Sequence, residues 1–501
     1  MTELGRFSLV LHTHLPWVAH NGTWPVGEEW LHQAFTGSWR RVLRVLETLA
    51  EHGYREVATL GVTPVVAAML DDPYCLSELH SWAGRWQLRA EELSARPALS
   101  ARPGLRALAD HERREAVACL DDLQRRWLTG GLSTVLRPLV DSGVIELLSG
   151  PATHPFQPLL TERFAAAQLS TGLADAQLRF GSRPAGIWAP ECGYAPGMEH
   201  FYAAHGVSHF LVDGPAVRGD TGFARPVGDS GVLAFARDLD ISYRIWSSRT
   251  GYPGGASYRD FHTFDHASGF RPARVTGGSV PTEAKQPWDR RLASAAVLRD
   301  AQDFVAAVVR RLTELRDRHG RQALVVAAFD TELFGHWWYE GPEFLDAVLR
   351  LLPQAGVRLS TLRGACSAGL VADRIDLPSS SWGAGKDWQV WDNDAVADLN
   401  DEIAHMQKRL FSLLDNRPDG AGRDPAADQL VREAFLLSSS DWAFMVSRNS
   451  AADYARERAR QHAERFTALA DAIESGAGAE RLAAELRAVD GPFGRLDART
   501  L

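Results

Sequence analysis

The stretch "ALVVAAFD" (residues 323–330) is a continuous apolar run that ends in an acidic side chain. Runs of the same kind recur along the chain, and helix-length segments separate them: "FSLVLH" (7–12), "VATLGV" (57–62), "VIELLSG" (144–150), "GIWAP" (186–190), "HFLVDG" (209–214) and "YRIWSS" (243–248). Unbroken Val, Ile and Leu runs are typical of parallel strands covered on both faces. The sequence therefore predicts an α/β protein, either a barrel or a doubly wound sheet.

Two parts of the chain lack such runs. Residues 72–140 contain helical patterns such as "HERREAVACLDDLQRRWL", and we expect a helical insertion there. Beyond residue 360 we expect three helices, in 401–416, 426–438 and 451–476. The predicted organisation is a main domain over 1–360, interrupted at 72–140, and a C-terminal helical domain over 361–501.

Composition narrows the class of protein. The chain has 501 residues, 45% of them hydrophobic, and a net charge of −9, which argues against nucleic acid or an anionic membrane as partner. No apolar run reaches the ~20 residues of a membrane span, and the N-terminal segment lacks signal-peptide features. Four scattered cysteines without CxxC spacing favour reduced thiols in the cytoplasm. Sixteen tryptophans favour a sugar-binding cleft.

Several predicted strands end in reactive side chains. His12 and His14 follow the first run, His154 the third, Glu191 the fourth and Asp330 the last. In barrels and open parallel sheets, functional residues stand at the C-terminal ends of strands. These side chains are therefore expected to converge.

Two carboxylates surrounded by aromatic residues suit the cleavage of a glycosidic bond. In retaining enzymes one carboxylate attacks the anomeric carbon while the other protonates the leaving oxygen. Asp330 follows "VVAAF", and an apolar setting raises the pKa of an acid/base residue. Glu191, as the attacking group, must stay ionised.

Simpler interpretations remain open for each residue. Glu191 could form a salt bridge or cap a helix, and Asp330 could cap the helix that follows it. His12 and His14 alternate along an extended segment, so one of them could be a packed core histidine. Trp337 and Trp338 could be structural.

A metal centre is a further alternative. His12, His14 and His154 together with an Asp could bind zinc, as in barrel-type carbohydrate deacetylases. Such sites usually take a carboxylate from an H-x-D pattern on the first strand, where this sequence has "HTH". We therefore expect neither a metal nor another cofactor.

The chain resembles glycoside hydrolase family 57, and within it the actinobacterial type of 1,4-α-glucan branching enzyme. Five stretches in the family's order carry the resemblance: "HTHLPW", "ATHPF", "GIWAPECGY", "AFDTELFGHWWYEGP" and "SSWGAGKDWQVWDN". The resemblance implies a (β/α)7 barrel, that is, a distorted TIM-like barrel, with a helical insertion and a C-terminal helical domain that contributes Trp residues to the cleft. It implies that Glu191 is the nucleophile and Asp330 the acid/base. The substrate-binding residues that it implies are His12, His14, His154, Trp24, Trp246, Trp382, Trp391, Asp441 and Trp442.

The activity that this resemblance implies is the cytoplasmic transfer of an α-1,4-glucan chain to a glucose 6-hydroxyl, as in glycogen synthesis. The sequence leaves the oligomeric state open, with a monomer among the options. Family members carry a mobile loop tipped by an aromatic residue, whereas residues 213–231 offer only Phe223 here, with Tyr252 and Tyr258 as substitutes. An α-amylase or a 4-α-glucanotransferase would use the same carboxylates. A zinc-dependent deacetylase and a non-catalytic glucan-binding protein are the alternatives from other classes.

Overall fold

Parallel strands form the centre of the protein, which we describe from a computed structural model covering residues 3–23, 26–96, 103–247, 250–418 and 422–501. Within these residues seven mutually parallel strands pair in the order β7-β5-β4-β3-β2-β1-β8. Their bounds are β1 Gly5–Thr13, β2 Ala58–Val62, β3 Ile145–Ser149, β4 Gly186–Ile187, β5 His209–Asp213, β7 Leu233–Arg237 and β8 Leu324–Asp330. Short strand β6 (Arg225–Pro226) pairs antiparallel with β7, and β9 (Val357–Leu359) pairs parallel with β1.

The two ends of this path meet. The Asp238 amide, directly after β7, donates a 2.8 Å hydrogen bond to the Val326 carbonyl of β8. The strands thus form a ring whose last junction is looser than the other six, as expected for a distorted barrel. The predicted α/β fold is confirmed.

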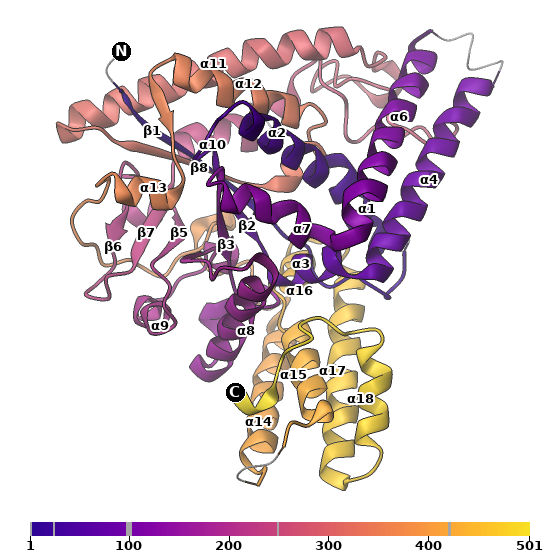
Figure 1. Cartoon of the computed structure of the whole chain (residues 1–501), viewed down its shortest axis with the longest axis vertical. Helices are drawn as coiled ribbons and strands as arrows, with labels where there is room; N and C mark the ends of the chain where they lie inside the picture. Colours follow the sequence, from indigo (N-terminus) through magenta and orange to yellow (C-terminus); the bar gives the residue numbers. More distant parts are fainter. Residues whose placement is uncertain (1–2, 24–25, 97–102, 248–249, 419–421) are drawn as a thin grey trace.

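Helices surround the ring (Figure 1). In the barrel part they are α1 Glu28–Ala34, α2 Arg40–Glu51, α3 Pro64–Asp71, α8 Glu162–Phe180, α9 Met198–Ala204, α10 Leu239–Trp246, α11 Arg290–His319, α12 Gly341–Gln354 and α13 Leu362–Ser367. Between β2 and β3 the chain adds α4 Pro73–Ala95, α6 Pro103–Asp122 and α7 Leu128–Asp141. Helices α4 and α6 pack side by side and project from one side of the barrel.

The expected strand at 243–248 is wrong. Its described residues begin within α10, which the Asp238 side chain caps by accepting a hydrogen bond from the Ile241 amide at 3.2 Å. The buried residues of α10 are Ile241, Ser242 and Ile245; the adjacent pair breaks the alternation of a strand, whereas the three positions share one side of a helix. The strand of this part of the ring is β7, just before it.

Helices also form the C-terminal part: α14 Ala397–Asp415, α15 Pro425–Leu437, α16 Ser440–Ser447, α17 Ala452–Ser475 and α18 Ala479–Arg487. Helix α15 is buried along its whole length, and α14, α17 and α18 pack against it. They form a bundle beside the barrel, with α16 nearest to it (Figure 1). In the described ranges no helix has both the length and the apolar composition that crossing a membrane requires.

Candidate active site

Glu191 lies in a short 3-10 turn, Pro190–Cys192, directly after β4. Its Oε1 accepts a hydrogen bond from the Ser440 hydroxyl at 2.8 Å, and its Oε2 accepts one from the Trp382 indole at 2.9 Å. The Trp382 amide also donates to the Glu191 carbonyl at 2.9 Å. Neutral donors from the C-terminal part therefore hold the carboxylate, which is neither an ion-pair partner of Lys or Arg nor a helix cap among the described residues.

The backbone around this carboxylate is strained. Glu191 has φ 59° and ψ 18°, and both Cys192 and His154 also have positive φ, at 50° and 56°. Left-handed backbone costs a non-glycine residue about 1–2 kcal/mol, and such strain concentrates at functional sites. Three such residues in one place indicate that the fold holds these side chains in a required direction.

Asp330 is the last residue of β8, in register with His12 of the neighbouring strand β1. It precedes a 3-10 turn, but its side chain makes no capping bond there, so the capping interpretation is wrong. Burial, and then the negative charge of Glu191, raise the pKa of Asp330 to about 7, against the opposing effects of His14 and Arg237. This group can hold and release a proton near neutral pH.

The pKa of Glu191 is also raised, chiefly by burial, while the bonds from Trp382 and Ser440 oppose the rise. Two neighbouring carboxylates cannot both ionise freely, because like charges penalise the second ionisation. Both hydrogen-bond donors act on Glu191 and favour its charged form, whereas the negative charge of Glu191 raises the pKa of Asp330. Of the two, Glu191 is the better placed to carry the charge and Asp330 the proton.

His12 and His154 are buried beside Glu191. Their Nε2 atoms lie 3.1 Å apart, and the His12 ring stacks on Trp188 at 4.3 Å between centroids. Burial lowers the pKa of both imidazoles, so both are neutral at pH 7. His154 Nδ1 lies 3.0 Å from the Ser440 hydroxyl.

These contacts fix the direction of the protons. The Ser440 hydroxyl has one proton and donates it to Glu191, so it must accept from the Nδ1–H of His154. Neutral His154 then accepts at Nε2 from the Nε2–H of His12, whose Nδ1 has no hydrogen-bond partner among the described residues. The tautomers follow from the network. A continuous chain of donors runs from His12 to the carboxylate of Glu191.

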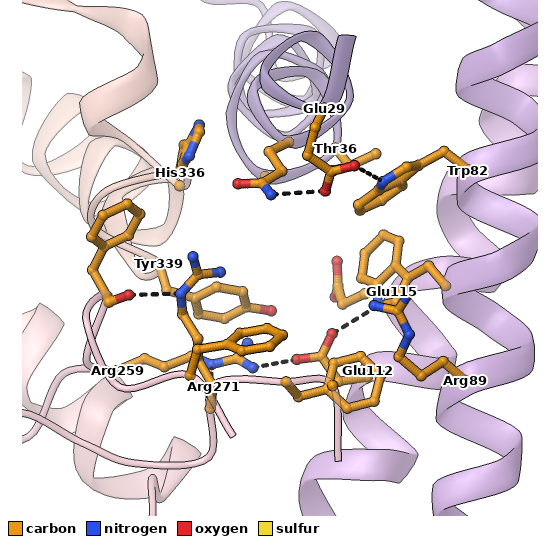
Figure 2. A pocket seen from close by; sticks show the side chains of 18 of the residues that line it. Glu29, Thr36, Trp82, Arg89, Glu112, Glu115, Arg259, Arg271, His336 and Tyr339 are labelled. Atoms are coloured by element: carbon orange, nitrogen blue, oxygen red, sulfur yellow. Dashed lines mark hydrogen bonds and ion pairs between the residues drawn. The ribbon is translucent and has the colours of Figure 1, made fainter. Parts of the chain in front are cut away.

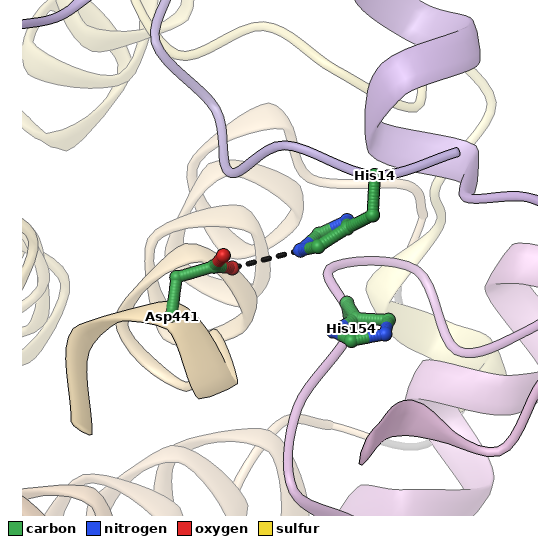
Figure 3. Close-up of side chains that lie close together, drawn as sticks. All are labelled: His14, His154 and Asp441. Atoms are coloured by element: carbon green, nitrogen blue, oxygen red, sulfur yellow. Dashed lines mark hydrogen bonds and ion pairs between the residues drawn. The ribbon is translucent and has the colours of Figure 1, made fainter. Parts of the chain in front are cut away.

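His14 occupies the other face of His154, with ring centroids 3.9 Å apart. Its Nε2 is 2.8 Å from Asp441 Oδ2, as Figure 3 shows, and its Nδ1 is 3.1 Å from the Thr63 hydroxyl. Burial would raise the pKa of Asp441, but His14 overcomes this and holds it below its usual range. His12 and His14 are two positions apart, which places them on the same face of an extended segment, and both histidines reach the site.

Two groups of side chains have the composition of a metal site. The donor atoms of His14, His154 and Asp441 lie within 4.8 Å of one another (Figure 3). All four ring nitrogens of the two histidines already have a protein partner, and an ion would have to displace these contacts. The second group, in the helical bundle, is fully buried and consists of Glu433, His462 and Asp490.

The second group is likewise joined internally. His462 Nδ1 is 2.9 Å from Glu433 Oε2, its Nε2 is 2.8 Å from an Arg458 nitrogen, and Asp490 pairs with Arg465. This buried network joins helices α15 and α17.

The tryptophans predicted to bind substrate fall into two groups: those that form a run of neighbouring rings starting at Trp382, and those buried in the core. Trp382 and Trp246 lie 6.1 Å apart at an interplanar angle of 29°, and Trp246 is 6.3 Å from the exposed Trp337. Trp391 is buried against Phe156. Its ring, expected to stack on sugar, has no free face.

Trp442 is also buried, and its indole donates to the Leu436 carbonyl at 2.9 Å, so it supports α16 from within. Trp338 is buried, in line with the structural interpretation. Trp24 lies outside the described residues.

The aromatic side chains considered for a cleft-closing loop lie elsewhere. Phe223 is buried beneath the Arg321 guanidinium. Tyr252 and Tyr258 each donate a 2.6 Å hydrogen bond to an aspartate of α11. None of the three takes that role in this structure. The indoles of Trp246, Trp337 and Trp382 are the aromatic groups near the carboxylates.

Sequence reasoning missed Ser440 and Arg237. Arg237, at the end of β7, bonds Asp213 at 2.8 Å and lies over the Trp382 ring at 5.2 Å. Lys386 bonds the other oxygen of Asp213 at 2.7 Å. This buried ion group supports Trp382 from below. The only sequence signal for Ser440 was its place beside Asp441 in "SSSDWAFM".

An α/β barrel with paired carboxylates of unlike protonation beside exposed indoles is the architecture of a carbohydrate-active enzyme. Comparisons with known proteins agree. Residues 8–377 match the model for glycosyl hydrolase family 57, and residues 402–501 match the model for the C-terminal part of 1,4-alpha-glucan branching enzymes. The chain belongs to glycosyl hydrolase family 57, as its motifs predicted.

Individual relatives refine this placement. The chain is 53% identical over 516 residues to a probable 1,4-alpha-glucan branching enzyme of Mycobacterium tuberculosis, covering 99% of this chain and 98% of that protein. A solved GH57-type branching enzyme of Pyrococcus horikoshii is 31% identical, with a TM-score of 0.92 over 99% of this chain and 96% of that one. An alpha-amylase of Thermotoga maritima is 27% identical, with a TM-score of 0.86 over 99% and 98%.

Proposed function

We propose that this protein is a 1,4-α-glucan branching enzyme that acts by double displacement. The observation that carries the proposal is the division of the carboxylate pair: Glu191 holds two hydrogen-bond donors, while the pKa of Asp330 is raised to about 7. A retaining enzyme needs one ionised nucleophile and one protonated acid. The full-length similarity to branching enzymes supports the choice of reaction.

In the first step Glu191 attacks the anomeric carbon of an α-1,4-linked glucose. The bond to O4 breaks, and Asp330 donates its proton to that oxygen. As the glucosyl–Glu191 ester forms, the carboxylate loses its charge, which removes the main charge that raises the pKa of Asp330 after burial. The pKa of Asp330 therefore falls, so that after giving up its proton this residue stays a carboxylate, which can accept the proton of the incoming hydroxyl.

In the second step the 6-hydroxyl of another glucan attacks the same carbon. Its proton passes to Asp330, the ester bond to Glu191 breaks, and an α-1,6 bond forms. Water in place of the hydroxyl would give hydrolysis. Trp246, Trp337 and Trp382 surround the entrance with apolar surface, which supports transfer over hydrolysis.

The proposed partner is an α-1,4-glucan such as amylose or a glycogen-like polymer, whose apolar sugar faces match exposed indoles. We propose the cytoplasm as the compartment, because all four cysteines are unpaired. We propose that the protein needs neither metal nor cofactor, since the site's histidines are engaged with protein groups.

Proton NMR of amylose incubated with the wild-type protein and with Glu191→Gln tests the function. New α-1,6 anomeric signal from the wild type alone is the expected result. Reducing ends without α-1,6 signal would make the protein a hydrolase. Equal α-1,6 signal from both proteins would exclude Glu191 as the nucleophile.

A further inference from the structure

A second cavity, of about 800 Å³, lies between the helical insertion and the barrel (Figure 2). Its walls come from the region of α1, from α4 and α6, from the loop 259–271 and from residues 335–339. Neither Glu191 nor Asp330 lines it. Its volume lies in the range of pockets that hold small-molecule ligands, about 300–1,000 Å³.

The cavity wall is aromatic, and parts of it are open to solvent. Phe264 and Trp337 are 40% and 39% exposed, unusual values for large apolar side chains in this protein. Trp82 and Trp86 of α4 line the opposite wall, and each indole nitrogen is held by a carboxylate, of Glu29 at 2.8 Å or Glu112 at 2.9 Å. Flat rings held in place in an open cavity offer stacking faces to a ligand.

The charges on the wall are nearly balanced. Four acidic and five arginine side chains line the cavity, and several are already paired, as Figure 2 shows for Arg259 and Glu112 at 2.5 Å. Because little net charge is available, the cavity suits a neutral ligand better than a phosphate or an organic acid. Aromatic faces alternating with fixed polar groups match a neutral polyhydroxyl chain.

Aromatic rings connect the cavity with the carboxylate pair. Trp337, on its wall, is 6.3 Å from Trp246, which is 6.1 Å from Trp382, whose indole nitrogen is bonded to Glu191. The wall segment 335–339 is also the continuation of the chain from Asp330. A chain lying in the cavity would therefore approach the carboxylates from the side of Asp330.

We propose that this cavity binds the acceptor α-glucan chain, an inference that rests on the branching function proposed above. The acceptor hydroxyl must reach the carboxylate that accepts its proton, and the cavity wall formed by residues 335–339 follows Asp330 closely in the chain. The O6 of the acceptor glucan attacks the anomeric carbon, the C–O bond to Glu191 breaks, and the hydroxyl proton moves to Asp330. The donor chain occupies the catalytic cleft instead, so the two chains use separate surfaces.

Phe264→Ala is the sharpest variant, because Phe264 is exposed and its loss leaves the barrel packing intact. Losing one stacking face lowers the ratio of α-1,6 bonds to reducing ends by about threefold to tenfold. The rate of hydrolysis of the donor stays at the wild-type value. Phe264→Tyr retains the ring and restores the ratio. Leu88→Ala, on α4 but outside the cavity wall, is the matched control.

Binding is measured separately with maltoheptaose and the inactive Asp330→Asn protein by calorimetric titration. Two binding events are expected, and adding Phe264→Ala weakens one of them by about threefold to tenfold. A branching wild type whose product ratio and titration are unchanged by Phe264→Ala overturns the acceptor site alone. A wild type that forms no α-1,6 bonds overturns the branching function itself. An equal fall of the ratio in Leu88→Ala also overturns the acceptor site.

Discussion

Replacing Ser440 with alanine should shift the pH dependence of catalysis toward higher pH. The Ser440 hydroxyl donates to Glu191 Oε1 at 2.8 Å and accepts from His154, whose Nδ1 is 3.0 Å away. A hydroxyl donates a stronger hydrogen bond to an ionised carboxylate than to a protonated carboxyl group. Its removal therefore destabilises the charged form of Glu191 and raises the pKa of this residue further.

The size of the shift follows from the strength of the lost bond. Hydrogen bonds to charged groups contribute about 1.5–3 kcal/mol, and one pKa unit corresponds to about 1.36 kcal/mol. Glu191 keeps its second bond, from Trp382, so the lower value applies. We expect the acidic limb of kcat/KM against pH, where activity is lost as Glu191 takes up a proton, to move up by about one unit.

The measurement is kcat/KM for glucan cleavage from pH 4 to 9. Steps of ~0.5 pH unit resolve a shift of this size. Ser440→Thr keeps the hydroxyl and should restore the wild-type limb. Ser447→Ala, on the same helix, removes a hydroxyl that donates to the Val390 carbonyl at 2.7 Å and should change nothing. An unshifted limb in Ser440→Ala, or an equal shift in Ser447→Ala, would refute the donor chain to Glu191.

Four further outcomes are expected. Asp330→Asn should lower transfer from glucan by about 10²–10⁴-fold yet spare fluoride release from α-maltosyl fluoride, whose leaving group needs no proton; equal losses on both donors would contradict an acid role. In the wild type, kcat/KM for glucan should fall above about pH 7, because Asp330 then loses the proton it must donate; this limb should be absent with the fluoride donor. Dialysis against EDTA should leave branching activity unchanged, and loss that only added zinc restores would contradict this. His462→Ala should remove the hydrogen bond between His462 and Glu433 Oε2 in the buried bundle and lower the free energy of unfolding by about 1–3 kcal/mol, read from urea titration by circular dichroism, and a change below ~0.5 kcal/mol would count against this role.

The sequence predicted correctly the parts of the fold in which the residues are uniformly apolar. Strands β1 and β8 are long apolar runs buried on both faces, and β2, β3 and β5 are shorter runs of the same kind. Strand β7 was missed because "LAFAR" is short and ends in Arg237, whose charge is neutralised by Asp213 from a neighbouring strand. Helix α10 is only eight residues long, a length over which apolar periodicity does not separate helix from strand.

The candidate site divides in the same way. Acidic and histidine side chains at strand ends can be recognised from the sequence, because few structural roles place such groups there. Ser440 does not, because a serine is common everywhere and its meaning comes from a contact 249 positions away in the chain. Trp391 was predicted to stack on sugar, but its ring is packed against Phe156. An indole can stack on a sugar or on another side chain, and only the packing of the folded protein decides which.

The way Glu191 is held links the two parts of the chain to one reaction. Both hydrogen-bond donors to this carboxylate, Trp382 and Ser440, lie beyond residue 377, where the match to the catalytic family model ends. The barrel alone supplies two carboxylates, and water would then fill the places of both donors. Water is also the competing acceptor that turns transfer into hydrolysis. The contacts from the C-terminal part therefore have two effects. The groups that favour the charged form of Glu191 in the absence of water also exclude water from the ester that this residue forms.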